Sequence, residues 1–220
     1  MKKTIIIFFL ALLGCVDSDP IVGEWKRTGD IYEGSIIKIE SFSVASVFVP
    51  GFSLVQNQYL SLNFHNRRDV DIEQKIGNTL VGYSIPPRKI AIVNPPERKG
   101  GLFSKVHRLE AGEYLRRNTQ YSSVEVQEIL SEFNIRPDER VCTLGYNEKT
   151  LLALKVAYFY TKDVIINSSG IDYSGAEKIA QVVSENIKEG SLIEFNYPSS
   201  RGREYVFQDI LGAPKVIETK

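Results

Sequence analysis

The sequence predicts an α/β protein in which an antiparallel β layer is followed by a mainly parallel sheet with flanking helices. Residues 35 to 93 are mainly β in pattern, whereas from residue 94 onward helical periodicity alternates with short apolar runs. With 43% hydrophobic and 25% charged residues, the 220-residue chain can bury one sizeable core. Its 27 basic and 27 acidic residues cancel, so the composition favours no nucleic-acid partner.

The first fifteen residues predict an export signal. In "MKKTIIIFFLALLGC", two lysines precede an apolar run from Ile5 to Leu13 that is too short to span a bilayer, and small Gly14 precedes Cys15. This end resembles the bacterial lipoprotein lipobox, which implies cleavage before Cys15 and lipidation of that residue. The resemblance therefore implies a membrane-anchored protein outside the cytoplasm. Val16 stands where inner-membrane retention signals have aspartate, which favours an outer membrane in a cell with two membranes.

Residues 16 to 34 are expected to form a tether that leads into a single α/β domain over residues 35 to 220. Its "GEW" (23 to 25) is similar to the Gly-x-Trp that opens lipocalin-like barrels, which leaves a small-ligand-binding β lipoprotein as an alternative. A lipocalin would continue as evenly spaced strands, whereas this chain turns helical after residue 111. We therefore expect Trp25 to be a packing anchor for the tether.

Alternating and apolar runs predict strands over residues 35–40, 42–49, 58–64 and 88–94. Pro50-Gly51 marks a turn, and the prolines that bracket 88–94 suggest a strand covered on both faces. The intervening "HNRRDVDIEQKIGN" (65 to 78) is polar and has no clear period. The first part of the domain is therefore expected to be a β layer.

The second part, residues 94 to 220, carries helix signals. Apolar spacing predicts a helix over residues 122–135 that begins at a serine cap and closes at Asn134, and a buried helix over 148–160. A strand over 163–166 is followed by a helix with Ser174 and Glu177 as a capping box, and Gly190 precedes a strand over 191–196. Strand, helix and strand in this spacing predict a parallel unit.

This order of segments resembles the nucleotide-binding domain of ABC transporter ATPases over roughly residues 36 to 212. The strand 88–94 lies where that family has the strand leading to its Q-loop, and "LFSKVHRLEAGEYL" (102 to 115) resembles the segment after it. The stretch "LGYNEKTLLALKVA" (144 to 157) resembles the signature motif and its helix, and "SSGID" (168 to 172) resembles the D-loop. The resemblance implies a P-loop-NTPase-like fold, here without a P-loop.

The residues that hydrolyse ATP in that family do not carry over. No G-x-x-x-x-G-K-[ST] loop occurs in the sequence, and "VIINSS" has no carboxylate for the Walker B pair. By the resemblance, the positions that correspond to the nucleotide site are Asn94, Gly145, Glu148, Asp172 and Tyr197. We therefore expect no catalytic residue, no cofactor and no enzymatic activity.

Other chemistry has little support in the residues. Once Cys15 is lipidated, Cys142 is the only thiol and is expected to be a small buried hydrophobe, while His65 and His107 have no metal-ligand spacing around them. Ser168 and Ser169 are expected to be polar loop residues. Scattered solvated charge is the expectation for Arg67, Arg68, Arg88, Arg98, Lys99, Arg201 and Arg203.

Three functions remain open from the sequence. The first is a lipid-anchored, non-catalytic envelope protein whose ABC-ATPase-like core binds or scaffolds another envelope protein. The second is an ATP-binding subunit of an ABC-type transporter with degraded motifs. The third is the lipocalin-like lipoprotein. The first is favoured because phosphoryl transfer depends on positioning groups that this chain lacks.

Overall fold

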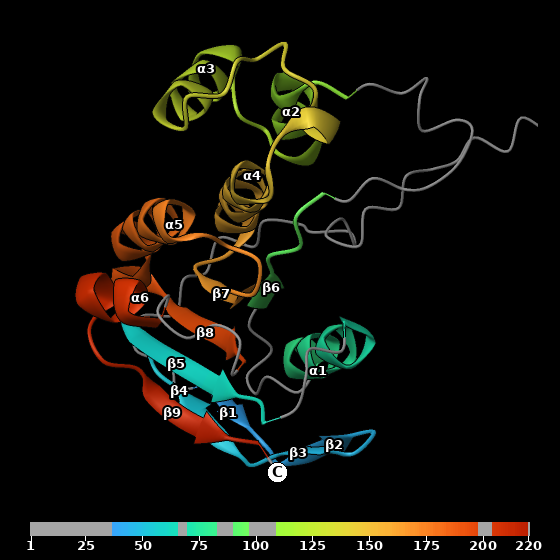
Figure 1. Cartoon of the computed structure of the whole chain (residues 1–220), viewed down its shortest axis with the longest axis vertical. Helices are drawn as coiled ribbons and strands as arrows, with labels where there is room; N and C mark the ends of the chain where they lie inside the picture. The colour runs from blue at the N-terminus through green and yellow to red at the C-terminus, as the bar shows by residue number, and fades with distance from the viewer. Residues whose placement is uncertain (1–36, 66–69, 83–89, 97–108, 198–203, 220) are drawn as a thin grey trace, which may run out of the picture.

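The computed structural model describes residues 37–65, 70–82, 90–96, 109–197 and 204–219. Its centre is a parallel five-stranded sheet in the order β6-β7-β8-β5-β9 (Figure 1). The strands are β5 (Gln58–Asn63), β6 (Ile90–Ile92), β7 (Asp163–Asn167), β8 (Ser191–Asn196) and β9 (Lys215–Glu218). The predicted α/β class is thereby confirmed. The predicted signal peptide, the lipidation site Cys15 and the tether with Trp25 lie outside the described residues.

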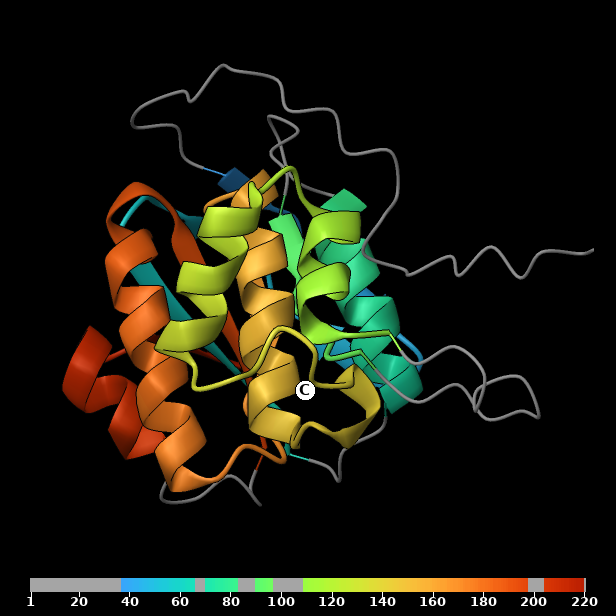
Figure 2. The ribbon, with the colours of Figure 1, turned by 90° about the horizontal axis from the view of Figure 1, so that it is seen from above.

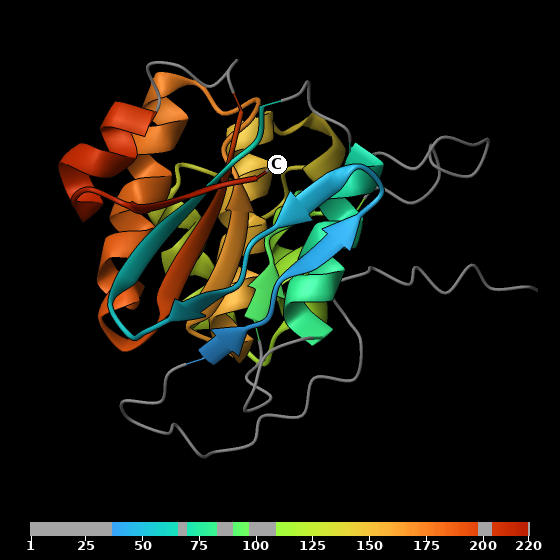
Figure 3. The same ribbon diagram turned by 90° about the horizontal axis from the view of Figure 1, so that it is seen from below.

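The predicted antiparallel layer is present as two strand pairs. β1 (Ile37–Ile39) pairs with β4 (Phe52–Leu54), and β2 (Phe42–Val44) pairs with β3 (Val47–Val49). The prediction of one strand over 42–49 is wrong, because Ala45 has a φ of 51° and the chain reverses there into a hairpin. Viewed from below, this layer lies across the sheet (Figure 3).

A helix replaces the predicted irregular segment after β5. α1 (Val70–Gly82) places Ile76 and Leu80 in the core, both with no exposed surface, and Ile72 is partly buried. These residues recur every four positions and form a narrow apolar stripe in an otherwise polar sequence. α1 and the antiparallel layer share one face of the sheet, and their core includes Leu60, Leu62, Ile165, Ile193 and Phe195.

The remaining helices cover the opposite face of the sheet (Figures 1 and 2). They are α2 (Ala111–Asn118), α3 (Ser123–Glu132), α4 (Tyr146–Tyr160), α5 (Tyr173–Asn186) and α6 (Glu204–Leu211), with 3-10 turns η2 (Val141–Thr143) and η3 (Ile187–Glu189). α4 packs against α2, α5, β6 and β7, and α2 and α3 lie farther from the sheet. α6 and β9 were not predicted.

The three central residues of strand β7, Val164 to Ile166, are all apolar because both faces of the strand are covered. Val164 and Ile166 belong to the core on the helix side, whereas Ile165 belongs to the core on the α1 side. Successive side chains of a strand point to opposite faces, so a strand covered on both faces needs a continuous apolar run. In the chain, β7 precedes α5 and β8 follows it, and the two strands pair in parallel. This pairing confirms the predicted strand-helix-strand unit.

Local capping fixes the helix boundaries. Ser122 begins α3 with a capping box. Its hydrogen bonds lower the pKa of the Glu125 carboxyl, with the larger effect from the backbone N–H and the smaller from the hydroxyl. Asn134, at φ 58°, closes that helix as predicted. The prediction for α5 is wrong by two residues, because Asp172 and not Ser174 is the N-cap and accepts a hydrogen bond from Gly175 N at 2.8 Å.

The lipocalin-like alternative is contradicted by this architecture. A lipocalin is a closed antiparallel barrel, whereas the described strands include a five-stranded parallel sheet flanked by helices.

Within the described ranges, no helix has the length and apolar character needed to cross a membrane.

Candidate functional site

The candidate site is the carboxyl edge of the parallel sheet, where open α/β sheets bind their ligands. Three adjacent strands end there in asparagine: β5 at Asn63, β7 at Asn167 and β8 at Asn196. Because the strands are parallel and neighbouring, their last residues lie beside one another at this edge, which the first turn of α1 also reaches. We call this group of residues, with Glu73 and Glu218, the asparagine edge.

At the centre of the asparagine edge, the Asn63 amide is engaged on both sides. Its Oδ1 accepts hydrogen bonds from Ser61 Oγ at 3.0 Å and Asn196 Nδ2 at 3.2 Å, and its Nδ2 donates to Glu218 Oε1 at 2.9 Å. Its backbone carbonyl accepts hydrogen bonds from the N–H and the hydroxyl of Thr219. The protein itself therefore supplies the partners that a ligand would need here.

Asn167, at the end of β7, is held by a carboxylate from α1. Its Nδ2 donates to Glu73 Oε2 at 2.5 Å, and its Oδ1 accepts from Ser169 N at 2.8 Å. Glu73 is 7% exposed and lies in the first part of α1. The N-terminal end of a helix favours negative charge, and here the protein's own carboxylate provides it. A phosphate group at the same place would meet a like charge in a poorly solvated position.

The structure places the five sequence-predicted positions as follows. Asn94 lies just after β6 and is partly exposed, Gly145 is the exposed N-cap of α4, and Glu148 lies in the first turn of that helix. Asp172 caps α5. Tyr197 is buried and stacks on Phe64, with ring centroids 4.8 Å apart. Their correspondence to a nucleotide site stays a prediction.

The first turns of α4 and α5 lie against each other. A side-chain carbon placed on Gly175 would meet the Asn147 amide, and one placed on Gly170 would contact the Tyr146 ring at 3.4 Å. The structure thus brings the segment of Gly145 and Glu148 close to the loop that ends at Asp172. Tyr197, in contrast, belongs to the core on the opposite face.

The structure also describes the thiol, the two serines and one of the histidines that the sequence singled out. The prediction that Cys142 is buried is wrong: η2 directs Val141 into the core and leaves Cys142 exposed. Ser168 and Ser169 lie in the loop after β7, as expected, and both are buried. His65 Nε2 lies 3.3 Å from Glu218 Oε2, and both side chains are exposed. His107, the six arginines and Lys99 named above lie outside the described residues.

No group of three or more His, Cys, Asp or Glu side chains within the described ranges is placed to hold a metal ion. One further carboxylate, Glu194 on β8, is 1% exposed and accepts a hydrogen bond from the Tyr59 hydroxyl. Sequence reasoning missed both Glu73 and Glu194. The spacing of Ile72, Ile76 and Leu80 could have placed Glu73 on a helix, but no local signal marks Glu194.

Among solved structures, an ATP-binding cassette of an ABC transporter and a bacterial ABC exporter have a similar fold. No family model and no curated protein matches the sequence. A nucleotide-free ATP-binding cassette from an ABC transporter superimposes with a TM-score of 0.54 at 12% identity, over 84% of this chain and 89% of that one. An RNase-L inhibitor structure gives 0.54 at 9% identity, over 85% and 39%. A bacterial ABC exporter with ATP bound gives 0.53 at 12%, over 81% and 37%.

The chain therefore has an ABC-ATPase-like fold, as its sequence order implies. At this level of identity, the likeness establishes the fold alone.

Glu73→Ala is expected to lower the free energy of unfolding by about 2 kcal/mol, because it removes the charged acceptor of the Asn167 amide. Urea denaturation followed by circular dichroism measures the loss. Gln74→Ala, at the adjacent exposed position of the same helix, is the matched control and should change stability by less than about 0.5 kcal/mol. Equal effects of the two substitutions would show that the Glu73–Asn167 contact does not stabilise the edge.

Proposed function

We propose that this protein is a membrane-anchored, non-catalytic module that uses an ABC-ATPase-like fold to hold another protein of the cell envelope. The observation that carries the proposal is the asparagine edge, where the side chains at the strand ends bond to one another. Asn63 bonds Asn196 and Glu218, and Asn167 bonds Glu73. A fold that served ATP turnover would keep this edge available to a triphosphate.

The chemistry of phosphoryl transfer supports this proposal. Catalysis of that reaction rests on backbone N–H groups and a lysine that cradle the phosphates, and on carboxylates that hold Mg²⁺ and position water. The sequence has no phosphate-binding loop motif, and the strand end that would carry the Walker B acid carries Asn167. A phosphate cradle at the N-terminal end of α1 would have to attract negatively charged phosphates, and the nearly buried Glu73 carboxylate would repel them.

Anchoring rests on the lipobox-like end of the signal sequence. In cells fed radioactive palmitate, we expect the protein to be labelled and Cys15→Ala to abolish the label. Cys142→Ala is the matched control, because Cys142 is exposed yet lies in the folded domain, and it should stay labelled. An unlabelled wild-type protein, or a Cys15→Ala variant that keeps its label, would refute the anchor.

The second candidate function is that of an ATP-binding subunit of an ABC-type transporter. The observation in its favour is the likeness to ATP-binding cassettes, among them an exporter with ATP bound. The two candidates differ in one property that can be measured directly, which is the affinity for Mg-ATP.

A further inference from the structure

The strands of the antiparallel layer form one long β-hairpin. β1 pairs with β4 and β2 pairs with β3 in a single register, in which Ile37 faces Leu54 at the base and Val44 faces Val47 beside the turn. We call residues 43–48, which include the turn, the hairpin tip. The β2–β3 end of the hairpin lies at one end of the long axis of the molecule, whereas α2 and α3 lie at the other (Figure 1).

The outer surface of the hairpin tip is uncharged. No charged residue occurs between Glu40 and His65, although charged residues make up 25% of the chain. Every described helix, in contrast, carries charged residues. Ala45 and Ser46 are exposed, and the ring of Phe48 points outward from β3 and is 38% exposed. The tip can therefore leave water without stripping the hydration shell from an ion.

The turn of the hairpin holds an apolar residue in a strained conformation. Ala45 has a φ of 51°, in the left-handed region, which glycine or asparagine would adopt at lower cost. Strained residues of this kind are concentrated at sites that contact ligands or partners. The turn thus keeps a methyl group at the point of the hairpin at some cost in local stability, which favours a contact there.

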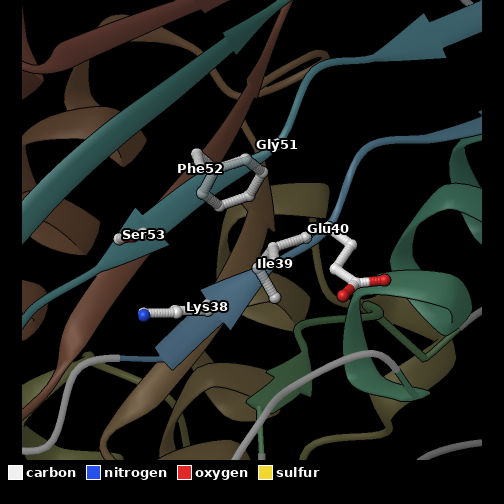
Figure 4. Close-up of a pocket in the computed structure, with 6 residues that line it drawn as sticks. All are labelled: Lys38, Ile39, Glu40, Gly51, Phe52 and Ser53. Carbon is white, nitrogen blue, oxygen red and sulfur yellow. The ribbon is translucent and has the colours of Figure 1, made fainter.

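The nearest charges lie at the base of the hairpin. Lys38 on β1 and Glu40 just after it are both exposed (Figure 4). They precede Ser43 by five and three residues, which corresponds to roughly 17 and 10 Å along an extended strand. Interfacial protein segments enter a bilayer by about 5–10 Å. Both charges would therefore stay in water while the hairpin tip enters a membrane surface.

A membrane is the partner that the chain itself connects to this hairpin. If Cys15 carries lipid, as the proposed function holds, residues 16–36 join the bilayer to Ile37, the first residue of the hairpin. These 21 residues span at most roughly 70 Å. Tethering raises the effective concentration of the bilayer, so one exposed ring can provide enough affinity for contact.

We propose that the hairpin tip inserts Phe48 into the headgroup region of the membrane that holds the lipid anchor. This inference rests on the proposed anchoring and adds an orientation to it. With the tip on the bilayer, α2 and α3 point away from the membrane, because they lie at the opposite end of the long axis (Figure 1).

Quenching by nitroxide lipids tests this contact in the full, lipidated chain. The Cys142→Ser variant leaves an introduced cysteine as the only reactive thiol, and the protein is placed in phosphatidylethanolamine–phosphatidylglycerol vesicles that contain nitroxide lipid. A fluorophore attached at Ser46→Cys should be quenched at least about twofold more than one attached at Gln127→Cys. Gln127 is the matched position because it is also polar and exposed, and it lies on α3.

A charge at the tip should release the contact. Phe48→Asp should lower the quenching of the fluorophore at Ser46→Cys by at least about twofold, because a carboxylate resists dehydration and is repelled by anionic lipid. Phe48 lies outside the core, opposite exposed Ser43, so the substitution leaves the fold intact. Val124→Asp on α3 also replaces an exposed apolar side chain, and as the control it should leave the quenching unchanged.

Flotation of the vesicles separates this inference from the anchoring on which it rests. Protein that floats with the vesicles but is quenched equally at both positions is anchored without inserting the tip, which overturns the inference alone. Protein that does not float contradicts both the anchoring and the inference. Quenching that Phe48→Asp leaves unchanged also overturns the inference. So does a fluorophore that is shielded in envelope membranes but not in lipid vesicles, because the tip would then bind a protein.

Discussion

Replacing Gly190 with alanine is expected to lower the free energy of unfolding by about 3 kcal/mol or more. Gly190 is buried immediately before β8, and a carbon added to its Cα would lie 1.9 Å from the carbonyl oxygen of Lys162 and 2.3 Å from its carbonyl carbon. These are backbone atoms that hold the sheet together, because the same Lys162 oxygen accepts a hydrogen bond from Ser191 N. Relief of the clash would therefore have to part β8 from the segment that precedes β7.

The φ of Gly190 is −147°, an extended value open to any residue, so the expected loss comes from the close approach alone. Gly212→Ala is an informative control. Gly212 has a φ of 85° but nothing within 4 Å of an added carbon, so its substitution should cost only about 1 kcal/mol of backbone strain. Thermal denaturation of both variants gives the comparison. A Gly190→Ala protein as stable as Gly212→Ala would show that the chain tolerates a shift at the residue before β8.

Phe207→Ala is expected to lower the free energy of unfolding by about 3–5 kcal/mol. Phe207 has no exposed surface and attaches α6 to the rest of the protein. The centroid of its ring lies 6.4 Å from that of Tyr59 on β5. The Tyr59 hydroxyl in turn donates a hydrogen bond to the buried Glu194. Removing the ring leaves a cavity beside the Tyr59 ring and weakens the packing of α6 against α5.

The effect can be measured by guanidinium denaturation. Asp209→Ala, at an exposed position of the same helix, is the control and should change stability by less than about 0.5 kcal/mol. A Phe207→Ala loss below about 1 kcal/mol would mean that the neighbouring side chains collapse into the space, contrary to a tightly packed α6.

The elements that the sequence predicted are those in which local pattern and burial agree. The centre of β7 is apolar because both of its faces are covered. Helix α3 is bounded by two residues of strong local preference, Ser122 and Asn134. The hairpin between β2 and β3 escaped prediction because its turn contains Ala45, which carries no turn signal. α1 escaped because its stripe of three apolar residues is narrow.

The candidate site was less predictable than the fold. The hydrogen bond between Glu73 and Asn167 joins residues 94 positions apart, and the bond between Asn63 and Asn196 joins residues 133 apart. These contacts depend on the strand order β6-β7-β8-β5-β9, which local sequence patterns do not encode. The resemblance gave the position of Asp172 at the end of its loop, but the structure gives it a local role as the cap of α5.

Isothermal titration calorimetry of the full chain with Mg-ATP is the most direct measurement of the central claim. If the asparagine edge is closed by its own side chains, and Glu73 holds the place of the phosphates, the titration will show no saturable heat up to millimolar nucleotide. A saturable curve with a Kd in the micromolar range would contradict this account and favour an ATP-binding transporter subunit.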